Sequence, residues 1–252
     1  MDPSPATLAL LVAAAFVAGL VDAVAGGGGL VTLPALLAAG LPPQIALGTN
    51  KGQSVFGSGA ALLSYARAGL VRGRQARITF PLGLLGATGG ALVLLEVSNQ
   101  ALKPLVLALL VAVSVFLAFR PRIADGAARG RRDRPWVAAA LALAIGAYDG
   151  FFGPGTGTFL ILGFVLLLGH TPLEASADAK VVNFASNLAS LVVFAAAGRI
   201  VWTCAAPMAA AQLVGATVGA RITVRGGDAL VRRIVMLVVL ATVGKLAWDL
   251  WG

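Results

Sequence analysis

The sequence predicts an all-α integral membrane protein made of two inverted repeats, each a glycine-broken helical hairpin followed by three transmembrane helices. Composition is the first reason: the 252-residue chain is 59% hydrophobic and 12% charged, whereas a soluble domain usually has about 25% charged residues. The second is a glycine-rich segment with one aspartate that occurs twice. The third is that basic residues gather in alternate loops, which is typical of multi-pass membrane proteins.

The repeat is visible when the chain is aligned with itself. GLVDAVAGGGGLVTLP (19–34) matches GAYDGFFGPGTG (146–157) at an offset of 127 residues, which aligns Asp22 with Asp149. The apolar segments are rich in Gly and Ala and too continuous for the alternating pattern of a membrane β-barrel, so we expect helices. Glycine breaks in two related halves are typical of secondary transporters.

Farther along, the offset becomes 129 residues. It aligns Lys51 with Lys180, and GATGGA (86–91) with GATVGA (215–220). The whole chain then divides into a first repeat, a basic linker and a second repeat, which together form one membrane domain. Their bounds are 1–119, 120–135 and 136–252.

Ten apolar runs follow one another, five in each half, and the last two lie at 203–221 and 230–250. The runs at 30–40 and 157–168 are too short to cross the hydrocarbon layer, which takes about 20 helical residues. Each follows the glycine break of its repeat, so we expect a hairpin with the preceding run, at 6–24 or 136–150. Irregular backbone at membrane depth must be buried in protein or face water.

Basic residues predict the orientation in the membrane. The basic segments 67–77, 119–135 and 221–233 should face the cytoplasm. Three crossings and one hairpin per repeat place all three segments inside and both termini outside, in a multi-pass protein of the plasma (inner) membrane. These loops account for the net charge of +9, and no aromatic residues interleave with them. We therefore expect the lipid bilayer, and not nucleic acid, as the partner of these charges.

Metal, cofactor and enzyme functions have little support. The chain has one cysteine, Cys204, and one histidine, His170. These residues exclude an internal disulfide and an ordinary zinc site. We expect His170 in a loop. No HExxH, GxSxG or paired-His motif is present, so an intramembrane enzyme is disfavoured, and we expect no metal and no cofactor.

The glycine breaks are the first candidate binding elements. A helix that starts after a break presents free N–H groups with partial positive charge, which suits an anion. Two such ends converge near the midplane in an inverted repeat, which favours a substrate cavity. The alternative is that the glycines only permit tight helix packing. The candidate residues are Gly27, Gly28, Gly29, Gly155, Thr156 and Gly157.

Two lysines inside apolar helices are the second candidate element. A lysine at a helix centre costs about 2.5–3.5 kcal/mol on the insertion scale. Lys51 and Lys180 should therefore face a cavity, a counter-ion or an anionic ligand, unless they snorkel to the headgroups. Amide and hydroxyl neighbours favour the cavity, because such donors suit a small oxyanion. These neighbours are Thr49, Asn50, Ser54, Asn183 and Asn187.

Three aspartates complete the candidate site. Asp22 and Asp149 lie one helical turn before their breaks, and Asp178 lies two residues before Lys180. Asp22 and Asp149 have three open roles. They pair with the lysines across the repeats, cap freed backbone N–H groups, or carry protons along the pathway. We assign all three aspartates to a coupling or structural ion-pair group.

The chain resembles the TauE/SafE family of membrane permeases, also called the sulfite exporter or 4-toluene sulfonate uptake permease family. The resemblance rests on VDAVAGGGGLVTLPALLAAGLPPQIALGTNKGQSVFGSGAALLSYARAG in the first half and on DGFFGPGTGTFL and KVVNFASN in the second. It implies transport of a small sulfur-containing anion such as sulfite, sulfoacetate, an aryl sulfonate or a taurine-related compound. It also implies a pathway along Gly26 to Gly29, Thr49, Asn50 and Lys51, and along Gly153 to Gly157, Lys180, Asn183 and Asn187.

We therefore expect a secondary transporter that moves such an anion by alternating access. Two alternatives remain open: a passive anion channel, and a permease of the same scaffold for a carboxylate. A metal cation as cargo is disfavoured by the two lysines and by the lack of Cys and His ligands.

Overall fold

The computed structural model describes residues 3–119 and 134–251, and within them the side chains outside 117–119 and 228–251. All regular structure in these residues is helical. All but the last two residues of the predicted linker at 120–135 lie outside the described part. The helices are α1 (Pro5–Ala25), α2 (Gly29–Ala38), α3 (Pro43–Arg67), α4 (Gly73–Glu96), α5 (Asn99–Phe119), α6 (Pro135–Phe151), α7 (Thr156–Leu168), α8 (Pro172–Ala196) and α9 (Trp202–Trp251).

Five of the described helices are long and apolar enough to cross a membrane: α1, α4, α5, α8 and the first part of α9. The two hairpin helices are short, as predicted: α2 has 10 residues and α7 has 13. Helix α3 has the same length as α8, 25 residues, but its polar residues lower its hydropathy. The prediction of an all-helical membrane protein is confirmed, whereas the inverted arrangement of the repeats stays a prediction.

Helix α9 changes direction once. Gly227 has φ 60° and ψ −160°, which separates Trp202–Gly227 from the helical residues that follow. Glycine reaches this backbone conformation at little cost because it has no Cβ. The break agrees with the two separate apolar runs expected at 203–221 and 230–250.

Prolines and one capping box set the starts of several helices. Helices α1, α3, α6 and α8 each begin with a proline, where a missing N–H costs nothing. At the start of α8 the Thr171 hydroxyl accepts from the Glu174 N–H, and the Glu174 carboxylate accepts from the Thr171 N–H. This reciprocal cap places Lys180 and Asn183 two to three turns inside α8.

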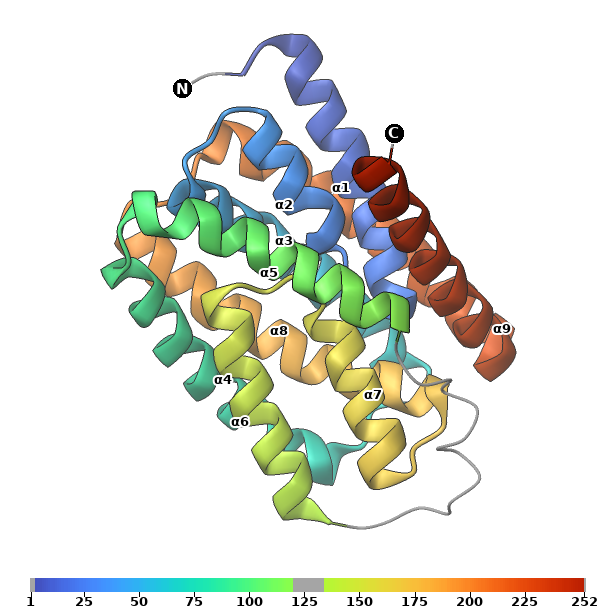
Figure 1. Cartoon of the computed structure of the whole chain (residues 1–252). Coiled ribbons are helices and arrows are strands. Elements are labelled where there is room, and N and C mark those ends of the chain that lie inside the picture. The colour runs from blue at the N-terminus through green and yellow to red at the C-terminus, as the bar shows by residue number, and fades with distance from the viewer. Residues whose placement is uncertain (1–2, 120–133, 252) are drawn as a thin grey trace.

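Glycines bring two pairs of helices into backbone contact. A Cβ at Gly86 or Gly90 on α4 would lie 2.2 or 2.0 Å from a carbonyl oxygen of α6. A Cβ at Gly215 or Gly219 on α9 would lie 2.1 or 2.4 Å from a carbonyl oxygen of α1. The aligned segments GATGGA and GATVGA therefore pack alike, each against the first helix of the other half. Figure 1 shows α4 beside α6, and α1 beside α9.

Helices α3 and α8 lie side by side and antiparallel. Near the start of α3 the Thr49 hydroxyl accepts from the N–H of Val201, which follows α8. Beyond the end of α3 the Arg72 guanidinium contacts Asp178 near the start of α8. Because α2 leads into α3 and α7 leads into α8, the two short helices run toward opposite ends of the molecule.

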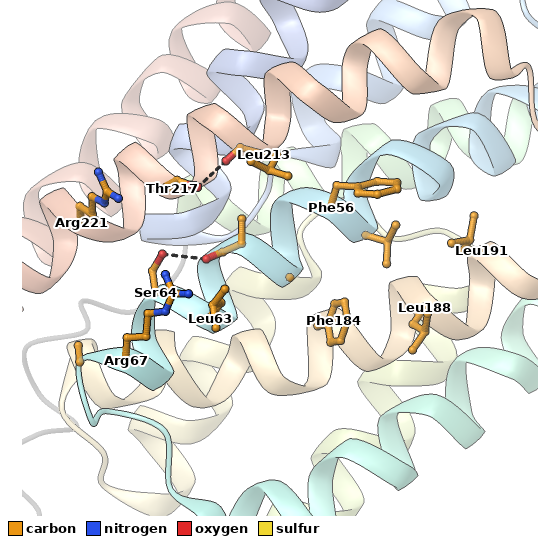
Figure 2. Close-up of a pocket in the computed structure, with 14 residues that line it drawn as sticks. Phe56, Leu63, Ser64, Arg67, Phe184, Leu188, Leu191, Leu213, Thr217 and Arg221 are labelled. Atoms are coloured by element: carbon orange, nitrogen blue, oxygen red, sulfur yellow. Dashed lines mark hydrogen bonds between the residues drawn. The ribbon is translucent and has the colours of Figure 1, made fainter.

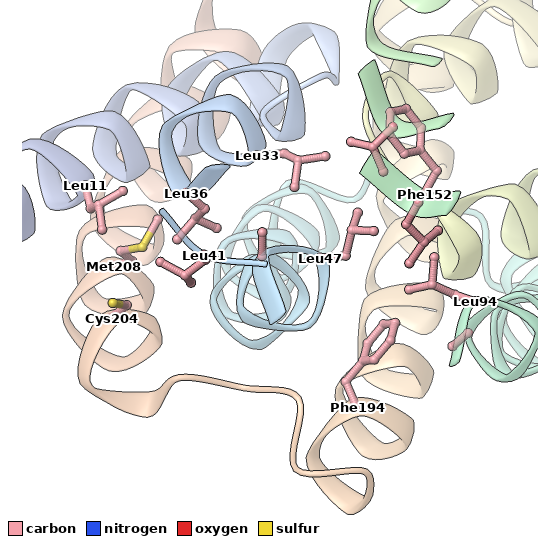
Figure 3. Packing of buried hydrophobic residues seen from close by; sticks show 14 of the residues in the cluster. Leu11, Leu33, Leu36, Leu41, Leu47, Leu94, Phe152, Phe194, Cys204 and Met208 are labelled. Atoms are coloured by element: carbon pink, nitrogen blue, oxygen red, sulfur yellow. The ribbon is translucent and has the colours of Figure 1, made fainter. Parts of the chain in front are cut away.

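Each short helix is buried in its own apolar cluster. The cluster around α2 includes Leu33 and Leu36 with Leu47 of α3 and Phe152 of the second break (Figure 3). The cluster around α7 includes Leu160 to Leu168 with residues of α1, α6 and α8. The two glycine breaks lie where α2 and α7 begin, so both breaks are enclosed by protein.

The outer faces of the helices are apolar. Large hydrophobic side chains that are more than half exposed include Leu10 on α1, Leu85 on α4, Leu107 on α5 and Val192 on α8. Extended apolar exposure is unusual for a soluble monomer but normal for a surface that faces lipid. This surface accords with the predicted bilayer partner.

Candidate functional site

Both glycine breaks contain the backbone conformations that only glycine adopts readily. In the first break Gly26 and Gly27 have φ 70° and 101°, and in the second Gly153 and Gly155 have φ 98° and 85°. These angles lie in the left-handed region, where a Cβ causes steric strain. The chain can therefore end one helix and begin another within four residues.

The two breaks touch each other. A Cβ at Gly26 would lie 2.3 Å from the backbone carbon of Gly157, and a Cβ at Gly157 would lie 2.6 Å from the Cα of Gly26. The Thr158 hydroxyl donates to the carbonyl oxygen of Ala25 at 2.9 Å. The two glycine breaks, which the repeat aligns at an offset of 127 residues, are thus in direct backbone contact.

Each lysine forms an ion pair with the aspartate of the other repeat. Lys51 Nζ lies 2.6 Å from Asp149 Oδ1, and Lys180 Nζ lies 2.7 Å from Asp22 Oδ2. The Lys51 and Lys180 side chains are 2% and 0% exposed. Burial to this degree rules out snorkelling of either lysine to the headgroups in this conformation.

The two carboxylates differ in their other partners. Asp149 also accepts hydrogen bonds from the hydroxyls of Thr156, at 2.9 Å, and Ser186. Asp22 accepts one from the Gly28 N–H at 3.2 Å. The structure thus combines two of the roles considered for these residues, since Asp22 and Asp149 both pair with a lysine and Asp22 also caps a freed N–H group.

A small polar cavity lies where the breaks and the lysines meet. Its volume is about 20 Å³, which is room for about one water molecule. It is lined by Asp22, Gly27, Gly29, Asn50, Lys51, Ser54, Asp149, Gly153, Thr156, Gly157, Asn183, Asn187 and Gln212. Eleven of these thirteen residues were candidate site residues from the sequence, and a twelfth, Gly153, lies in the pathway that the family resemblance implies.

The network around Asn50 sets the direction of its amide. Asn50 Oδ1 accepts from the Thr32 hydroxyl at 2.6 Å and from Gln53 Nε2 at 3.0 Å. With the oxygen occupied, Nδ2 is the part of the amide that can donate to a ligand in the cavity. Asn183 Nδ2 lies against the second break, 3.2 Å from a Cβ built at Gly157.

Five predicted site residues lie outside the cavity lining. Lys180 reaches the site through Asp22, and Gly28 through its hydrogen bond to Asp22. Thr49 instead binds the loop after α8, and a Cβ at Gly155 would lie 2.6 Å from Val113 of α5. The fifth is Asp178.

Asp178 belongs to a separate cluster near the ends of α3 and α7. It accepts from the Arg72 guanidinium, and His170 Nδ1 lies 3.3 Å from its Oδ2. His170 is in the predicted loop but is buried and stacked on Phe164, with ring centroids 5.6 Å apart. This cluster ties the α3–α4 loop to the start of α8.

Of the other two cavity residues, Gly153 was named only through the family resemblance, and Gln212 was not expected. A Cβ at Gly153 would lie 2.8 Å from Lys51 Nζ, so this glycine makes room for the ion pair. Gln212 is buried on α9, and its Oε1 has no hydrogen-bond partner in the described residues. The signal for Gln212 was an amide in an apolar helix, at a position that the repeat aligns with Gly83.

No group of three or more His, Cys, Asp or Glu residues within the described ranges is arranged to hold a metal ion. The charged side chains that line the cavity are instead those of Asp22, Asp149 and Lys51, and Lys180 pairs with Asp22 from outside the lining. Such a set is balanced in charge when the cavity holds no ligand.

Comparison with known proteins agrees with this architecture. The family model described as sulfite exporter TauE/SafE matches residues 11–246. A probable membrane transporter protein, ORF9, of Sinorhizobium sp. is 41% identical over 96% of this chain and 93% of its own length. One from Haemophilus influenzae is 37% identical over 99% and 98%, and YfcA of Escherichia coli K12 is 33% identical over 99% and 93%.

No solved structure matches the chain at a significant level. The assignment therefore rests on the sequence relatives, which extend over nearly the whole chain and are named as probable membrane transporters, not as enzymes. Together with the helices that can span a bilayer, these matches show that the chain belongs to the TauE/SafE family and is a membrane-embedded transporter.

Proposed function

We propose that this protein is a secondary transporter that moves a small sulfur-containing anion, such as sulfite, a sulfonate or a taurine-related compound, across the plasma membrane by alternating access. One observation carries the proposal: two ion pairs, each between different repeats, meet at a narrow polar cavity where two helix breaks are in contact. Transporters of several folds bind their substrates at such breaks.

The donors around the cavity suit an oxyanion. Amide groups of Asn50, Asn183 and Gln212 border it, with the hydroxyl of Ser54 and the ammonium group of Lys51. A sulfite or sulfonate group offers three oxygens to such donors, and hydrogen bonds to a charged acceptor are stronger than neutral ones. Carboxylate cargo would use the same donors, so it remains the alternative substrate class.

The size of the cavity supports a carrier. With room for about one water molecule, the cavity must widen before any of these anions can enter. Alternating access includes a state in which the protein closes around the binding site. A passive channel, in contrast, needs a continuous water-filled path in its open state. The structure would then represent a closed, substrate-free conformation.

Substrate entry must also change the ion pairs. Each lysine is already neutralised by an aspartate, so an arriving anion competes with a carboxylate for an ammonium group. Asp22 is 14% exposed and has fewer partners than Asp149. The Lys180–Asp22 pair is therefore the one that substrate opens, while Lys51–Asp149 holds the repeats together.

Several contacts support the inverted repeat. The α4–α6 and α1–α9 glycine contacts are equivalent under the sequence alignment, and so are the two ion pairs. Helices α3 and α8, which carry the lysines, run antiparallel. Opening would then move α1 with α9 against α4 with α6, since each of these pairs is packed backbone to backbone.

The basic loops support the proposed orientation. Arg72 in the 67–77 loop lies at the same end of the molecule as His170, in agreement with the path that places both inside. The 221–233 segment begins at that end, since Arg221 and Arg67 border one groove. Labelling of cysteines introduced at Ser64 or Ser98 in intact cells tests this orientation: only position 98 should react with an impermeant reagent.

Counterflow in proteoliposomes tests the function. Vesicles preloaded with unlabelled sulfite, taurine, sulfoacetate or acetate are diluted into trace radiolabelled sulfite. A carrier for sulfur oxyanions gives saturable accumulation that the sulfur compounds support and acetate does not. Equal flux without preloading would point to a channel, and support by acetate alone would point to a carboxylate permease. Vesicles without protein serve as the baseline.

A further inference from the structure

A second cavity, much larger than the polar one, opens on the outer side of helices α3, α8 and α9. Its volume is about 760 Å³, within the ~300–1,000 Å³ of sites for small organic ligands. Phe56, Leu63 and Leu213 on its walls are 45%, 51% and 42% exposed. The cavity is therefore a groove on the lipid-facing surface, distinct from the small polar cavity at the breaks.

The groove has one apolar part and one basic end. Figure 2 shows Phe56, Leu188 and Leu191 at one end and Arg67 and Arg221 at the other. The arginines come from different helices, α3 and α9, and neither forms an ion pair with a carboxylate in the described residues. Ser64 lies beside them but donates its hydroxyl to the Ala60 carbonyl.

We propose that this groove binds an anionic phospholipid, with an acyl chain along the apolar part and the phosphate between Arg67 and Arg221. Charge complementarity selects this occupant, because a long apolar chain ending in a negative group matches the groove at both ends. Basic pockets between helices on the cytoplasmic side are suited to anionic headgroups. The basic loops place these arginines on that side, where anionic lipids attract Lys and Arg.

Two other occupants fit less well. The linker at 120–133 carries many arginines, so the basic end of the groove would repel it. A second copy related by a twofold axis along the membrane normal would bring Arg67 and Arg221 against the same arginines. Neither the linker nor a second copy of the chain has the net negative charge that would complement the arginines.

Lipid binding to purified protein tests the proposal. The delipidated protein is titrated with phosphatidylglycerol or phosphatidylcholine of equal chain length, and bound lipid is counted by native mass spectrometry. Phosphatidylglycerol should bind more tightly, and a phosphatidylglycerol with short acyl chains should bind more weakly than one with long chains. The headgroup alone, glycerophosphoglycerol, should not displace the lipid.

Matched variants locate the site. Arg67→Gln with Arg221→Gln should weaken phosphatidylglycerol binding about 10- to 30-fold, as expected for two arginines near a lipid phosphate. Arg74→Gln with Arg77→Gln removes the same charge from exposed positions of α4 outside the groove and should leave binding unchanged. Equal loss in both double variants, equal affinity for the two lipids, or a dimer whose disruption frees the groove would each overturn the proposal. Thermal unfolding of each variant shows whether it is folded.

Discussion

The two ion pairs occupy equivalent places in the two repeats, yet their surroundings differ. Asp149 is held by Lys51 and by the hydroxyls of Thr156 and Ser186. The repeat places Gly29 and Gly57 at the positions of those hydroxyls, so Asp22 lacks both of these donors. Both repeats therefore contribute to an equivalent ion pair, but only Lys51–Asp149 has the two additional hydroxyl donors.

This difference separates two tasks that a transporter must perform. A pair whose carboxylate accepts three hydrogen bonds and whose side chains are both buried is costly to open, which suits a permanent link between the repeats. A pair with a partly exposed carboxylate is easier to separate, which suits exchange with a substrate anion. We assign the first task to Lys51–Asp149 and the second to Lys180–Asp22.

The largest expected effect comes from removing one carboxylate. Asp149→Asn leaves Lys51 buried without its counter-ion, and breaking a buried pair in this way costs about 3–5 kcal/mol. Asp22→Asn should cost less, because the Asp22 side chain is 14% exposed whereas that of Asp149 is 3% exposed. Thermal unfolding in detergent measures both losses. A loss for Asp22→Asn as large as that for Asp149→Asn would remove the distinction between the pairs.

A double variant sharpens the same comparison. Lys51→Gln with Asp149→Asn replaces the ion pair by two amides and should recover much of the stability lost in Asp149→Asn alone. Transport should remain impaired, since Lys51 also borders the cavity.

The next effect concerns the hydroxyl that reinforces Asp149. Ser186→Ala removes a hydrogen bond to a charged group and should lower the free energy of unfolding by about 1.5–3 kcal/mol. Ser58→Ala is the matched control, because the equally buried Ser58 hydroxyl donates to carbonyl oxygens of its own helix. Urea titrations of the two variants should differ clearly. If they coincide, Ser186 does not reinforce the pair.

A smaller effect comes from the close contact between the two glycine breaks. Gly26 and Gly69 have similar φ angles, 70° and 72°, but a Cβ at Gly69 would meet nothing within 4 Å. Gly26→Ala should therefore cost about 1–3 kcal/mol more than Gly69→Ala, which is the usual penalty for overpacking. Thermal unfolding midpoints measure the difference.

Gly153→Ala should behave differently from Gly26→Ala. The added Cβ meets the side-chain ends of Lys51 and Asp149 and not backbone atoms, so these ends can shift with the ion pair kept; stability should then fall less than in Gly26→Ala, while transport falls because Lys51 and Asp149 border the cavity. If Gly26→Ala and Gly153→Ala lost the same stability, the backbones of the two breaks would have to lie farther apart than they do in this structure.

Two kinds of feature could be predicted from the sequence: those that occur in both repeats, and those that depend on the length of an apolar run. The short helices α2 and α7 were predictable because their apolar runs are too short to cross a bilayer and follow glycine breaks. The two lysines and two aspartates were predictable because unpaired charges are costly in an apolar helix. The direction change at Gly227 also agreed with two separate runs.

Other features depend on contacts between distant segments. Pairing of the aspartates with lysines of the other repeat was one of three roles that the sequence left open, and the alignment alone could not choose among them. Gln212 was not predicted because the repeat aligns it with Gly83, so the two halves share no polar residue at this position. Asp178 was grouped with the site by its closeness to Lys180, yet it lies in the Arg72 cluster.

The most direct test of the central claim is whether a negative charge placed in the polar cavity abolishes anion binding. Gln212→Glu keeps the shape of the side chain and adds a carboxylate to the cavity, whereas Gln75→Glu adds one on α4 outside it. The measurement is the thermal unfolding midpoint against the concentration of the sulfur anion that supports counterflow, because a ligand of the folded state raises that midpoint. The wild type and Gln75→Glu should show the same saturable rise and Gln212→Glu none; an unchanged affinity in Gln212→Glu would contradict the account.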